Sequence, residues 1–304
     1  MPKKKEKNAS PDYPQMTRNL LEASLNAEVC KLPAGLYLVP TPLGHLGDIT
    51  LRALMTLAQA DVIACEDTRT SGVLLHAFGI STPTLAYHEH NEDGAGAALI
   101  ARMEQGQAVA LISDAGTPGI ADPGFRLVRA CRAAGHAVTV LPGACAVITA
   151  LAGSGLPTDC FLFAGFLPPK SAARQTKLTP LRRVEATLIF YESPARLAAS
   201  LTDMKEILGP DRPAVVTREI SKLFEETRQG TLAALAQHYA QTETKGEIVI
   251  LVGGRAEEDP IDLDALLIAR LSQLSLRDAV AEVAALTGLP KKEVYARALD
   301  LSAL

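Results

Sequence analysis

Two carboxylates lie in a stretch rich in glycine and proline, residues 113–124, which reads Ser-Asp-Ala-Gly-Thr-Pro-Gly-Ile-Ala-Asp-Pro-Gly. The stretch follows an apolar run typical of a buried strand, and ligands of α/β sheets collect at the carboxyl ends of strands. Glycines let the backbone approach a ligand, and Asp114 is placed to accept hydrogen bonds from a ribose or an amino group. The alternative is a long structural turn in which Asp114 and Asp122 are only turn residues.

A second loop of this kind, residues 40–50, contains two prolines and two glycines, and its Asp48 is placed to cap a helix that begins near Thr50. The glycines are too far apart for the Gly-x-Gly-x-x-Gly dinucleotide fingerprint, and no acidic residue follows at the expected distance. The loop therefore disfavours a nicotinamide cofactor. An ordinary loop with a helix cap remains an alternative to a ligand site.

Two short polar motifs follow the next expected strands. Glu66, Asp67 and Arg69 form the first, and on their own they indicate a helix N-terminus, where acidic residues are favoured by the helix dipole. His88 and His90 form the second and share one face of an extended chain. No third ligand follows at a suitable spacing, so we predict no metal site and favour a surface loop.

The elements that must position these residues alternate between short apolar runs and helical patterns, which is typical of an α/β sheet domain. Strands are expected first at residues 36–39, 62–65, 84–87, 108–112 and 138–141, with helices such as 52–59 and 125–134 between them. Such short connections predict a largely parallel sheet covered on both faces. Further strands are expected at residues 161–164, 187–191, 215–218, 227–229 and 247–252.

The alternating pattern breaks at residues 153–157, Gly-Ser-Gly-Leu-Pro, where we place a domain boundary. The sequence thus predicts a flexible leader at residues 1–32, two α/β domains at 33–153 and 154–254, and a small helical domain at 260–304. In that last domain, residues 275–286 and 291–299 are amphipathic segments joined by a turn with Gly and Pro, a helix-turn-helix outline.

Composition limits the classes of protein open to this chain. Its 304 residues are 48% apolar with a net charge of −4, so any affinity for RNA has to come from local patches. The five cysteines form no Cys-x-x-Cys pair, which suits a reducing cytosol and argues against a zinc cluster. No run approaches the roughly 18 apolar residues of a membrane span, and the N-terminus lacks a signal core. We expect a soluble, cytoplasmic protein with no membrane contact.

Together these motifs resemble those of the tetrapyrrole-methylase superfamily and, within it, the ribosomal RNA small subunit methyltransferase I group. The similarity runs from Gly35 to Gly254, and the helical tail resembles that group's C-terminal extension. It is carried by residues 41–44 (Thr-Pro-Leu-Gly), 66–69 (Glu-Asp-Thr-Arg), 114–124, 154–156 (Ser-Gly-Leu), 165–170 (Gly-Phe-Leu-Pro-Pro-Lys), 191–194 (Tyr-Glu-Ser-Pro) and 218–222 (Arg-Glu-Ile-Ser-Lys). Two positions depart from the group's pattern, His45 in place of Asn and Ala144 in place of Pro.

The resemblance implies a methyltransferase that depends on S-adenosylmethionine, with this cofactor folded into a cleft between the two α/β domains. Backbone groups and small side chains dominate the implied cofactor contacts, which are Leu43, Asp114, Thr117, Ala144, Cys145, Phe163, Ala164, Gly246 and Glu247. The implied substrate is the ribose 2′-oxygen of a cytidine in small-subunit (16S) ribosomal RNA. Homodimers are expected, as in the superfamily.

Methyl transfer to a ribose hydroxyl requires alignment of a poor nucleophile, helped by a positioned base or a cation. We expect Glu66, Arg69 and Lys170 to be catalytic, with the two cations on phosphate, and we assign no residue as the base. The expected substrate-binding residues are Asp67, His88, Tyr191, Glu192, Arg196, Glu219 and Lys222.

Two alternatives to this function stay open. One is methylation of a tetrapyrrole or a protein, against which the helical tail speaks, because an added module suits a macromolecular substrate. The other is a non-catalytic nucleic-acid-binding regulator that uses residues 275–299 as its reading unit. Saturable binding of S-adenosylmethionine distinguishes the enzyme from the regulator.

Overall fold

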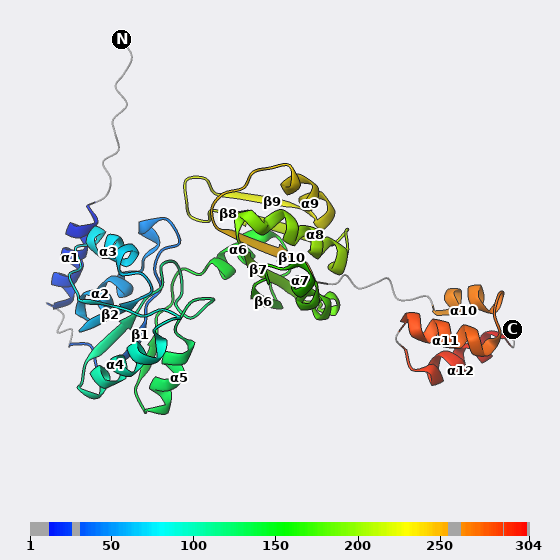
Figure 1. The fold of residues 1–304 in the computed structure, drawn as a ribbon, viewed down its shortest axis with the longest axis horizontal. Coiled ribbons are helices and arrows are strands. Elements are labelled where there is room, and N and C mark those ends of the chain that lie inside the picture. The colour runs from blue at the N-terminus through cyan, green and yellow to red at the C-terminus, as the bar shows by residue number, and fades with distance from the viewer. Residues whose placement is uncertain (1–11, 26–30, 255–262, 288, 303–304) are drawn as a thin grey trace, which may run out of the picture. The chain divides into compact units, whose positions relative to one another are not determined.

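The computed structural model describes residues 12–25, 31–254, 263–287 and 289–302. By contacts the chain forms two compact units, which divide after Gly254. The first unit contains two sheets, each with its own helices, and the second is helical (Figure 1). Residues 33–153 and 154–254 both lie in the first unit, so their separation into two domains stays a prediction.

The first sheet of the described chain is parallel, with strand order β3-β2-β4-β1-β5. Its strands are β1 (Gly35–Leu38), β2 (Val62–Cys65), β3 (Thr84–Ala86), β4 (Ala108–Leu111) and β5 (Val138–Val140). Its helices are α2 (Leu51–Gln59), α3 (Thr68–Ala77), α4 (Glu92–Glu104) and α5 (Phe125–Ala133). Helices α2 and α3 pack on one face of the sheet, and α4 and α5 on the other. The expected parallel sheet, covered on both faces, is confirmed.

Helix α1 (Tyr13–Leu25) lies in the segment that we expected to be a flexible leader. It packs against α2, and the Tyr13 and Phe78 ring centroids are 5.2 Å apart. Thr17 is buried, and its hydroxyl donates a hydrogen bond to the Tyr13 carbonyl. The structure thus places a helix in the segment that we expected to be a leader, and Tyr13 packs against the first core. Residues 1–11 and 26–30 lie outside the described residues.

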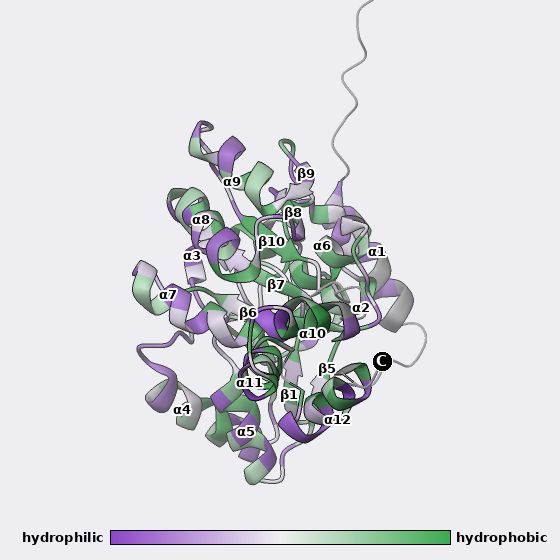
Figure 2. Ribbon diagram, turned by 90° about the vertical axis from the view of Figure 1, so that its right-hand side faces the viewer, coloured by the Kyte–Doolittle hydropathy of each residue, from purple (hydrophilic) through white to green (hydrophobic). Residues whose placement is uncertain are grey.

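The second sheet has the order β6-β7-β10-β8-β9 and is mixed, since only β6 and β7 are parallel. Its strands are β6 (Phe161–Phe166), β7 (Thr187–Glu192), β8 (Pro213–Arg218), β9 (Glu226–Thr231) and β10 (Ile248–Val252). Figure 2 shows β10 as hydrophobic along its length, which agrees with burial of all five of its residues. Helices α7 (Ser171–Leu178), α8 (Leu197–Leu208) and α9 (Leu232–Ala240) pack on one face.

Helix α6 (Ala146–Ser154) covers the other face of the second sheet. Its Val147 and Leu151 pack in one cluster with Val249 of β10. The expected boundary at residues 153–157 is thus the end of α6, where Gly155 adopts a left-handed conformation with φ of 71°. By packing, the chain changes sheets before α6, near the loop that follows β5.

The second unit contains α10 (Leu263–Leu271), α11 (Leu276–Thr287) and α12 (Lys291–Ser302). Leu267, Val283 and Val294 from the three helices are fully buried in a common core. The sequence predicted α11 and α12 but not α10. None of the helices in the described ranges has the length and hydropathy needed to cross a membrane.

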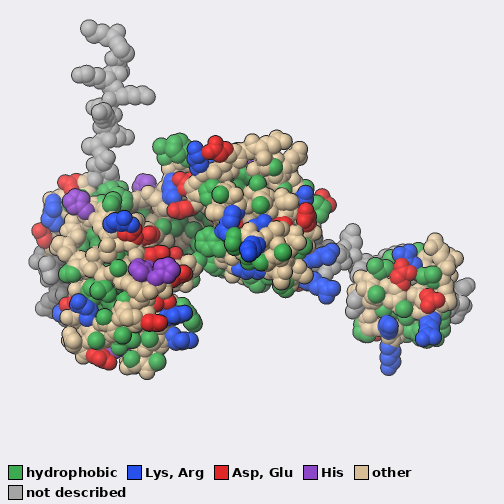
Figure 3. Space-filling view, in the orientation of Figure 1, with side chains coloured by type: hydrophobic (Ala, Val, Ile, Leu, Met, Phe, Trp, Pro, Cys, Tyr) green, Lys and Arg blue, Asp and Glu red, His purple; other side chains and the backbone are tan. Residues whose placement is uncertain are grey.

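The surface carries mixed charges. On the face shown in Figure 3, Lys and Arg side chains are interspersed with Asp and Glu and form no continuous basic area. In the second half of the first unit, Arg196, Arg218 and Lys222 each form an ion pair with a glutamate.

Candidate active site

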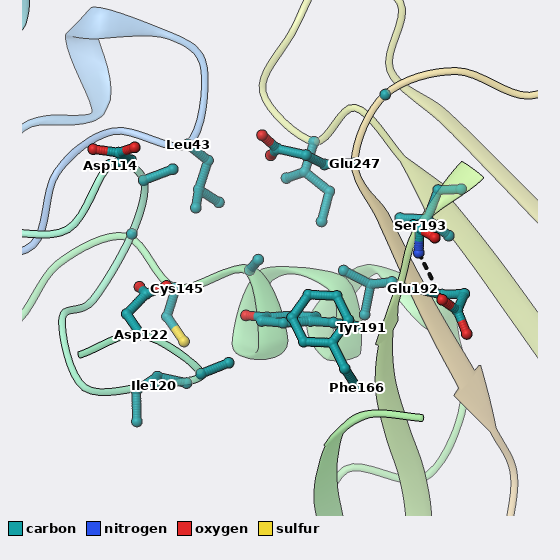
Figure 4. A pocket seen from close by; sticks show the side chains of 18 of the residues that line it. Leu43, Asp114, Ile120, Asp122, Cys145, Phe166, Tyr191, Glu192, Ser193 and Glu247 are labelled. Carbon is teal, nitrogen blue, oxygen red and sulfur yellow. Dashed lines mark hydrogen bonds between the residues drawn. The ribbon is translucent and has the colours of Figure 1, made fainter. Parts of the chain in front are cut away.

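A cavity of about 400 Å³ opens where the carboxyl ends of the first sheet's strands face β7 and β10 of the second sheet (Figure 4). Ligand pockets of proteins typically measure about 300–1,000 Å³. The cavity brings together eight residues that the sequence analysis selected: Leu43, Asp114, Thr117, Cys145, Tyr191, Glu192, Gly246 and Glu247. Its lining is mainly apolar, and within the described residues no Lys or Arg lines it.

Three loops of the first sheet form one connected wall of the cavity. The loops after β1 and β4 are joined by two hydrogen bonds, from Thr41 N to the Gly116 carbonyl (2.9 Å) and from Gly116 N to the Thr41 carbonyl (3.0 Å). Gly116 has a φ of 83°, and a Cβ there would lie 3.1 Å from Leu43 Cδ2, so this position requires glycine. The Thr117 hydroxyl donates a hydrogen bond to the Ala144 carbonyl (2.9 Å), and this bond joins the loop after β5 to the other two loops.

The two departures from the family pattern are both accommodated in this wall. His45 Nδ1 accepts a hydrogen bond from Gly47 N (3.1 Å) and so caps the short 3-10 helix η1 (Leu46–Asp48), a role that an asparagine side chain also fills. Ala144 contributes its carbonyl to the bond with Thr117, which does not depend on the identity of its side chain.

Tyr191 at the end of β7 forms the opposite wall. Its ring meets Phe163 and Phe166 edge to face, with centroid distances of 4.9 and 5.5 Å. Phe166 lines the cavity, whereas Phe163 and Ala164 pack in the two hydrophobic clusters of the second sheet. The Ala164 carbonyl accepts a hydrogen bond from Lys177 Nζ (2.8 Å). Phe163 and Ala164, the two cofactor contacts expected on β6, therefore do not line the cavity, and Phe166 is the residue of β6 that does.

Glu192 supports the cavity from behind. Its carboxylate accepts hydrogen bonds from Ser193 N (2.8 Å) and the Ser200 hydroxyl, and it pairs with Arg196 (2.7 Å). Figure 4 shows this carboxylate turned away from Tyr191 and bonded to Ser193. Glu192 and Arg196, both expected to bind substrate, therefore hold the turn after β7 in the shape that lines the cavity.

Charged side chains close one edge of the cavity. Glu219 Oε1 accepts from Glu247 N and from Lys222 Nζ, both at 2.9 Å, and Lys222 Nζ lies 3.2 Å from Glu247 Oε2. The Glu247 amide and the Lys222 ammonium lower the pKa of Glu219. The Ser221 hydroxyl donates to Asp48 in the loop after β1. Glu219 and Ser221 both have positive φ, 54° and 64°, a strained conformation that is typical of functional sites.

The motif at residues 66–69 lies beside the cavity wall and does not line the cavity. Hydrogen bonds from the Arg69 side chain and backbone amide lower the pKa of Asp67 to about 2. The Arg69 guanidinium lies 2.8 Å from Asp67 and its side chain is 90% exposed. Burial, followed by the charges of Asp114 and Glu89, raises the pKa of Glu66.

His88 and Lys170 also lie outside the cavity lining. The rings of His88 and His90 are 6.0 Å apart, and Lys170 is exposed at the start of α7. No group of three or more His, Cys, Asp or Glu side chains is placed to hold a metal ion in the part of the chain that the structure describes.

Asp122 is a cavity residue that the sequence analysis treated only as a turn residue. It is half-buried in the loop after β4 and lines the cavity close to Cys145 (Figure 4). Burial, and after it the charges of Glu66 and Asp114, raise the pKa of Asp122 to about 6, although a hydrogen bond with Ser113 opposes the shift. The signal in the sequence was its place in the same glycine-rich loop as Asp114.

Two sequence families match the chain. Residues 35–236 match the family described as Tetrapyrrole (Corrin/Porphyrin) Methylases. The chain belongs to this family. Residues 257–302 match the family described as RsmI C-terminal HTH domain, which agrees with the helix-turn-helix outline of the tail.

Curated relatives place the chain within one group of that family. It is 54% identical over 274 residues to a Mesorhizobium japonicum protein named ribosomal RNA small subunit methyltransferase I. The alignment covers 89% of this chain and 93% of that relative. A Vibrio cholerae protein of the same name is 49% identical over 87% of this chain and 94% of its own length. The resemblance to this group that the motifs indicated is confirmed.

The fold is also confirmed by a solved structure. Uroporphyrin-III C-methyltransferase from Thermus thermophilus, complexed with S-adenosyl homocysteine, superposes with a TM-score of 0.51 at 20% identity over 72% of this chain and 97% of its own. The family consists of methyltransferases that use S-adenosylmethionine, as expected from the sequence. The residues present fit this cofactor, because an apolar cavity of sufficient size offers the Asp114 carboxylate as an acceptor, and the described residues that line it include no Lys or Arg that would repel a sulfonium.

Replacement of Asp114 by alanine is expected to weaken binding of S-adenosylmethionine by roughly 10- to 150-fold, because a hydrogen bond to a charged group is worth about 1.5–3 kcal/mol. Titration calorimetry with the cofactor measures this change directly. The matched control is Asp159→Ala, which removes an exposed carboxylate that does not line the cavity. If Asp114→Ala binds as tightly as the control, Asp114 is not a cofactor ligand.

Proposed function

We propose that this chain transfers a methyl group from S-adenosylmethionine to the ribose 2′-oxygen of a cytidine in small-subunit ribosomal RNA. The observation that carries the proposal is that relatives named ribosomal RNA small subunit methyltransferase I align with 86–89% of the chain. The cavity suits the reaction, because its apolar walls keep water away from a reacting methyl group.

The bound cofactor would supply a methyl group on a positively charged sulfur. The chain's own residues would hold the reactants in line, which is the main requirement of such a displacement. Asp114, Thr117 and the backbone at Gly246 would fix the cofactor against the wall formed by Leu43. Tyr191 and Phe166 would close the opposite side and restrict entry of the ribose.

The residues that we propose to face the RNA are exposed or partly exposed groups outside the cavity lining, in the first half of the unit and at the start of α7. Within the described residues, Arg69 is paired with Asp67 alone, and an exposed pair of this kind is worth roughly 0–1 kcal/mol. Phosphate can therefore replace Asp67 at little cost. Lys170 is likewise exposed, and we retain both cations as phosphate contacts, with Glu66 and His88 on the substrate side.

The partners follow from the proposed substrate. The chain would act on the small ribosomal subunit or its RNA, and hence in the cytoplasm, where ribosomes are made. We retain the homodimer as part of this proposal. The similar solved structures share only the fold with this chain at 15–23% identity, so they do not favour a tetrapyrrole or protein substrate.

The proposal is tested by transfer of labelled methyl from S-adenosylmethionine to small ribosomal subunits that lack their methylations, followed by mapping of the labelled nucleoside. We expect label on the 2′-oxygen of a single cytidine. Label on a base, or none at all from a protein that binds the cofactor, would contradict the proposed substrate while leaving the family assignment intact.

A further inference from the structure

Four carboxylates line the cavity: Asp114, Asp122, Glu192 and Glu247. The Glu192 carboxylate is occupied by Ser193, Arg196 and Ser200, and that of Glu247 pairs with Lys222. Both carboxylates are therefore engaged in ion pairs. Asp114 and Asp122 remain, and within the described residues neither is ion-paired with a Lys or Arg.

The position of Asp122 is built by a strained loop. Ala121, directly before it, has a φ of 65°, and Gly119 and Gly124 on either side have φ of 83° and 142°. A left-handed conformation at a residue other than glycine costs free energy, on the order of 1–3 kcal/mol, and persists only where the surroundings impose it. The loop is held by close packing, since a Cβ on Gly124 would lie 3.0 Å from Leu111 Cδ2. The strain thus fixes the Asp122 carboxylate at the cavity instead of in solvent.

The groups that face Asp122 come from both halves of the cavity. Ser113, Asp114, Glu66 and Cys145 lie on the same side of the cavity as Asp122, and Tyr191 lies on the opposite wall. Burial and the two carboxylates raise the pKa of Asp122 to about 6, while Ser113 opposes them. Burial, and then Cys145 and Asp122, raise the pKa of the Tyr191 hydroxyl above its usual value, so this hydroxyl keeps its proton at neutral pH and cannot be the acceptor.

We propose that Asp122 is the proton acceptor of the methyl transfer, an inference that rests on the proposed function. The ribose oxygen forms a bond to the methyl carbon while the carbon–sulfur bond breaks, and the electron pair of that bond stays on sulfur. The hydroxyl proton passes to an Asp122 carboxylate oxygen, and the O–H electron pair neutralises the charge on the new ether oxygen. Asp114 keeps its separate role on the cofactor.

A carboxylate with a pKa near 6 suits this task, because a general base works best when its pKa lies near the operating pH and it is still ionised. At pH 7 most Asp122 side chains are ionised, yet they are more basic than an ordinary aspartate. General base catalysis typically contributes about 10²- to 10⁴-fold. The neighbouring Glu66 and Asp114 serve this function by raising the proton affinity of Asp122.

The test is Asp122→Asn, compared with Asp159→Asn as a matched exposed control. We expect kcat for RNA methylation to fall by about 10²- to 10⁴-fold, while calorimetry shows affinity for S-adenosylmethionine within about threefold of wild type. Circular dichroism during heating checks that the variant is folded. A kcat within threefold of wild type would overturn the proposal, and so would a loss of cofactor affinity large enough to explain the loss of activity.

The pH profile provides a readout that a purely structural role of Asp122 does not move. Because the ionised form is active, kcat of the wild type is expected to rise as pH increases through about 6 and then to level off. Asp122→Glu should keep this rise of kcat with pH, and Asp122→Asn should lose it. A wild-type profile that is flat between pH 5 and 8 contradicts the proposal even if Asp122→Asn fails to fold. A wild type that binds the cofactor but leaves the cytidine 2′-oxygen unmethylated overturns the proposed function instead.

Discussion

Asp203→Ala is expected to lower the free energy of unfolding by about 3–5 kcal/mol, the usual cost of removing one partner of a buried ion pair. Asp203 on α8 and Arg174 on α7 form a salt bridge with side-chain exposures of 7% and 4%. Ser171 and Gln175 donate to the same carboxylate. Truncation leaves the Arg174 guanidinium buried with only the Pro168 and Pro169 carbonyls as acceptors. Urea unfolding followed by circular dichroism measures the loss.

Two comparisons separate a lost ion pair from a generally weakened fold. Asp211→Ala removes an exposed carboxylate and should change stability by less than about 0.5 kcal/mol. The double variant Arg174→Met with Asp203→Leu should recover most of the stability, because apolar replacements of buried pairs are often neutral. If Asp203→Ala loses no more than Asp211→Ala, the buried pair does not stabilise the fold.

The same pair has a defined dependence on pH. Burial raises the pKa of Asp203, but hydrogen bonds from Gln175, Arg174 and Ser171 outweigh it and lower the pKa below its usual value. A carboxylate whose pKa is lowered by folding stabilises the folded state above its unfolded pKa of about 3.9. This contribution is lost as pH falls through the folded-state pKa, so it is fully present at neutral pH.

Buried strands were the most predictable part of the fold. The run Val62–Cys65 was predicted with the bounds that β2 has, because strands buried on both faces read as uninterrupted apolar runs. The edge strand β9 is polar and was predicted three residues too short. Helices α1 and α10 were missed, because each is stabilised by long-range packing, of Tyr13 on the first core and of Leu267 on the helical core.

The sequence could predict cavity residues that follow regular strands, but not those on a strand with an irregular pairing register. Loops that follow parallel strands must meet at one edge of the sheet, and so Leu43, Asp114 and Cys145 line one cavity. On β6, the pairing register with β7 shifts between Phe163 and Phe166. A β-bulge changes which side chains share a face, and a sequence pattern does not show where one occurs. Phe166 therefore lines the cavity where Phe163 was expected.

Asp122 was underestimated for a related reason. The φ of Ala121 turns the chain so that Asp122 meets the cavity, and a non-glycine residue gives no indication in the sequence that it adopts a left-handed conformation. Glu192, Glu219 and Lys222 were recognised as site residues, but the sequence could not show that Glu192 pairs with Arg196 and that Glu219 pairs with Lys222. The residue types indicated the chemistry of the site, and the ion pairs of the folded chain decide which side chains remain available for it.

Removal of the helical tail after Gly254 is expected to lower affinity for small-subunit RNA by about 10²- to 10⁴-fold, the usual loss when one of two linked binding modules is removed. Affinity for S-adenosylmethionine should stay within about twofold, because the cavity and its cores lie entirely in the first unit. Filter binding of labelled RNA and calorimetry with the cofactor measure the two affinities. A truncated protein with full affinity for RNA contradicts a binding role of the tail.

A charge variant of the complete chain tests whether the tail acts through phosphate. Arg277, Lys291 and Lys292 are exposed, whereas Arg270 and Arg297 pair with Glu282 and Asp264. Replacing the three exposed cations by glutamine leaves the tail's apolar core unchanged. It should raise KM for RNA with little change in kcat and reduce the slope of log affinity against log salt by about 2–3, since each phosphate contact contributes about 0.7–0.9. If truncation weakens RNA binding but this variant does not, the tail binds RNA through its shape and not through these charges.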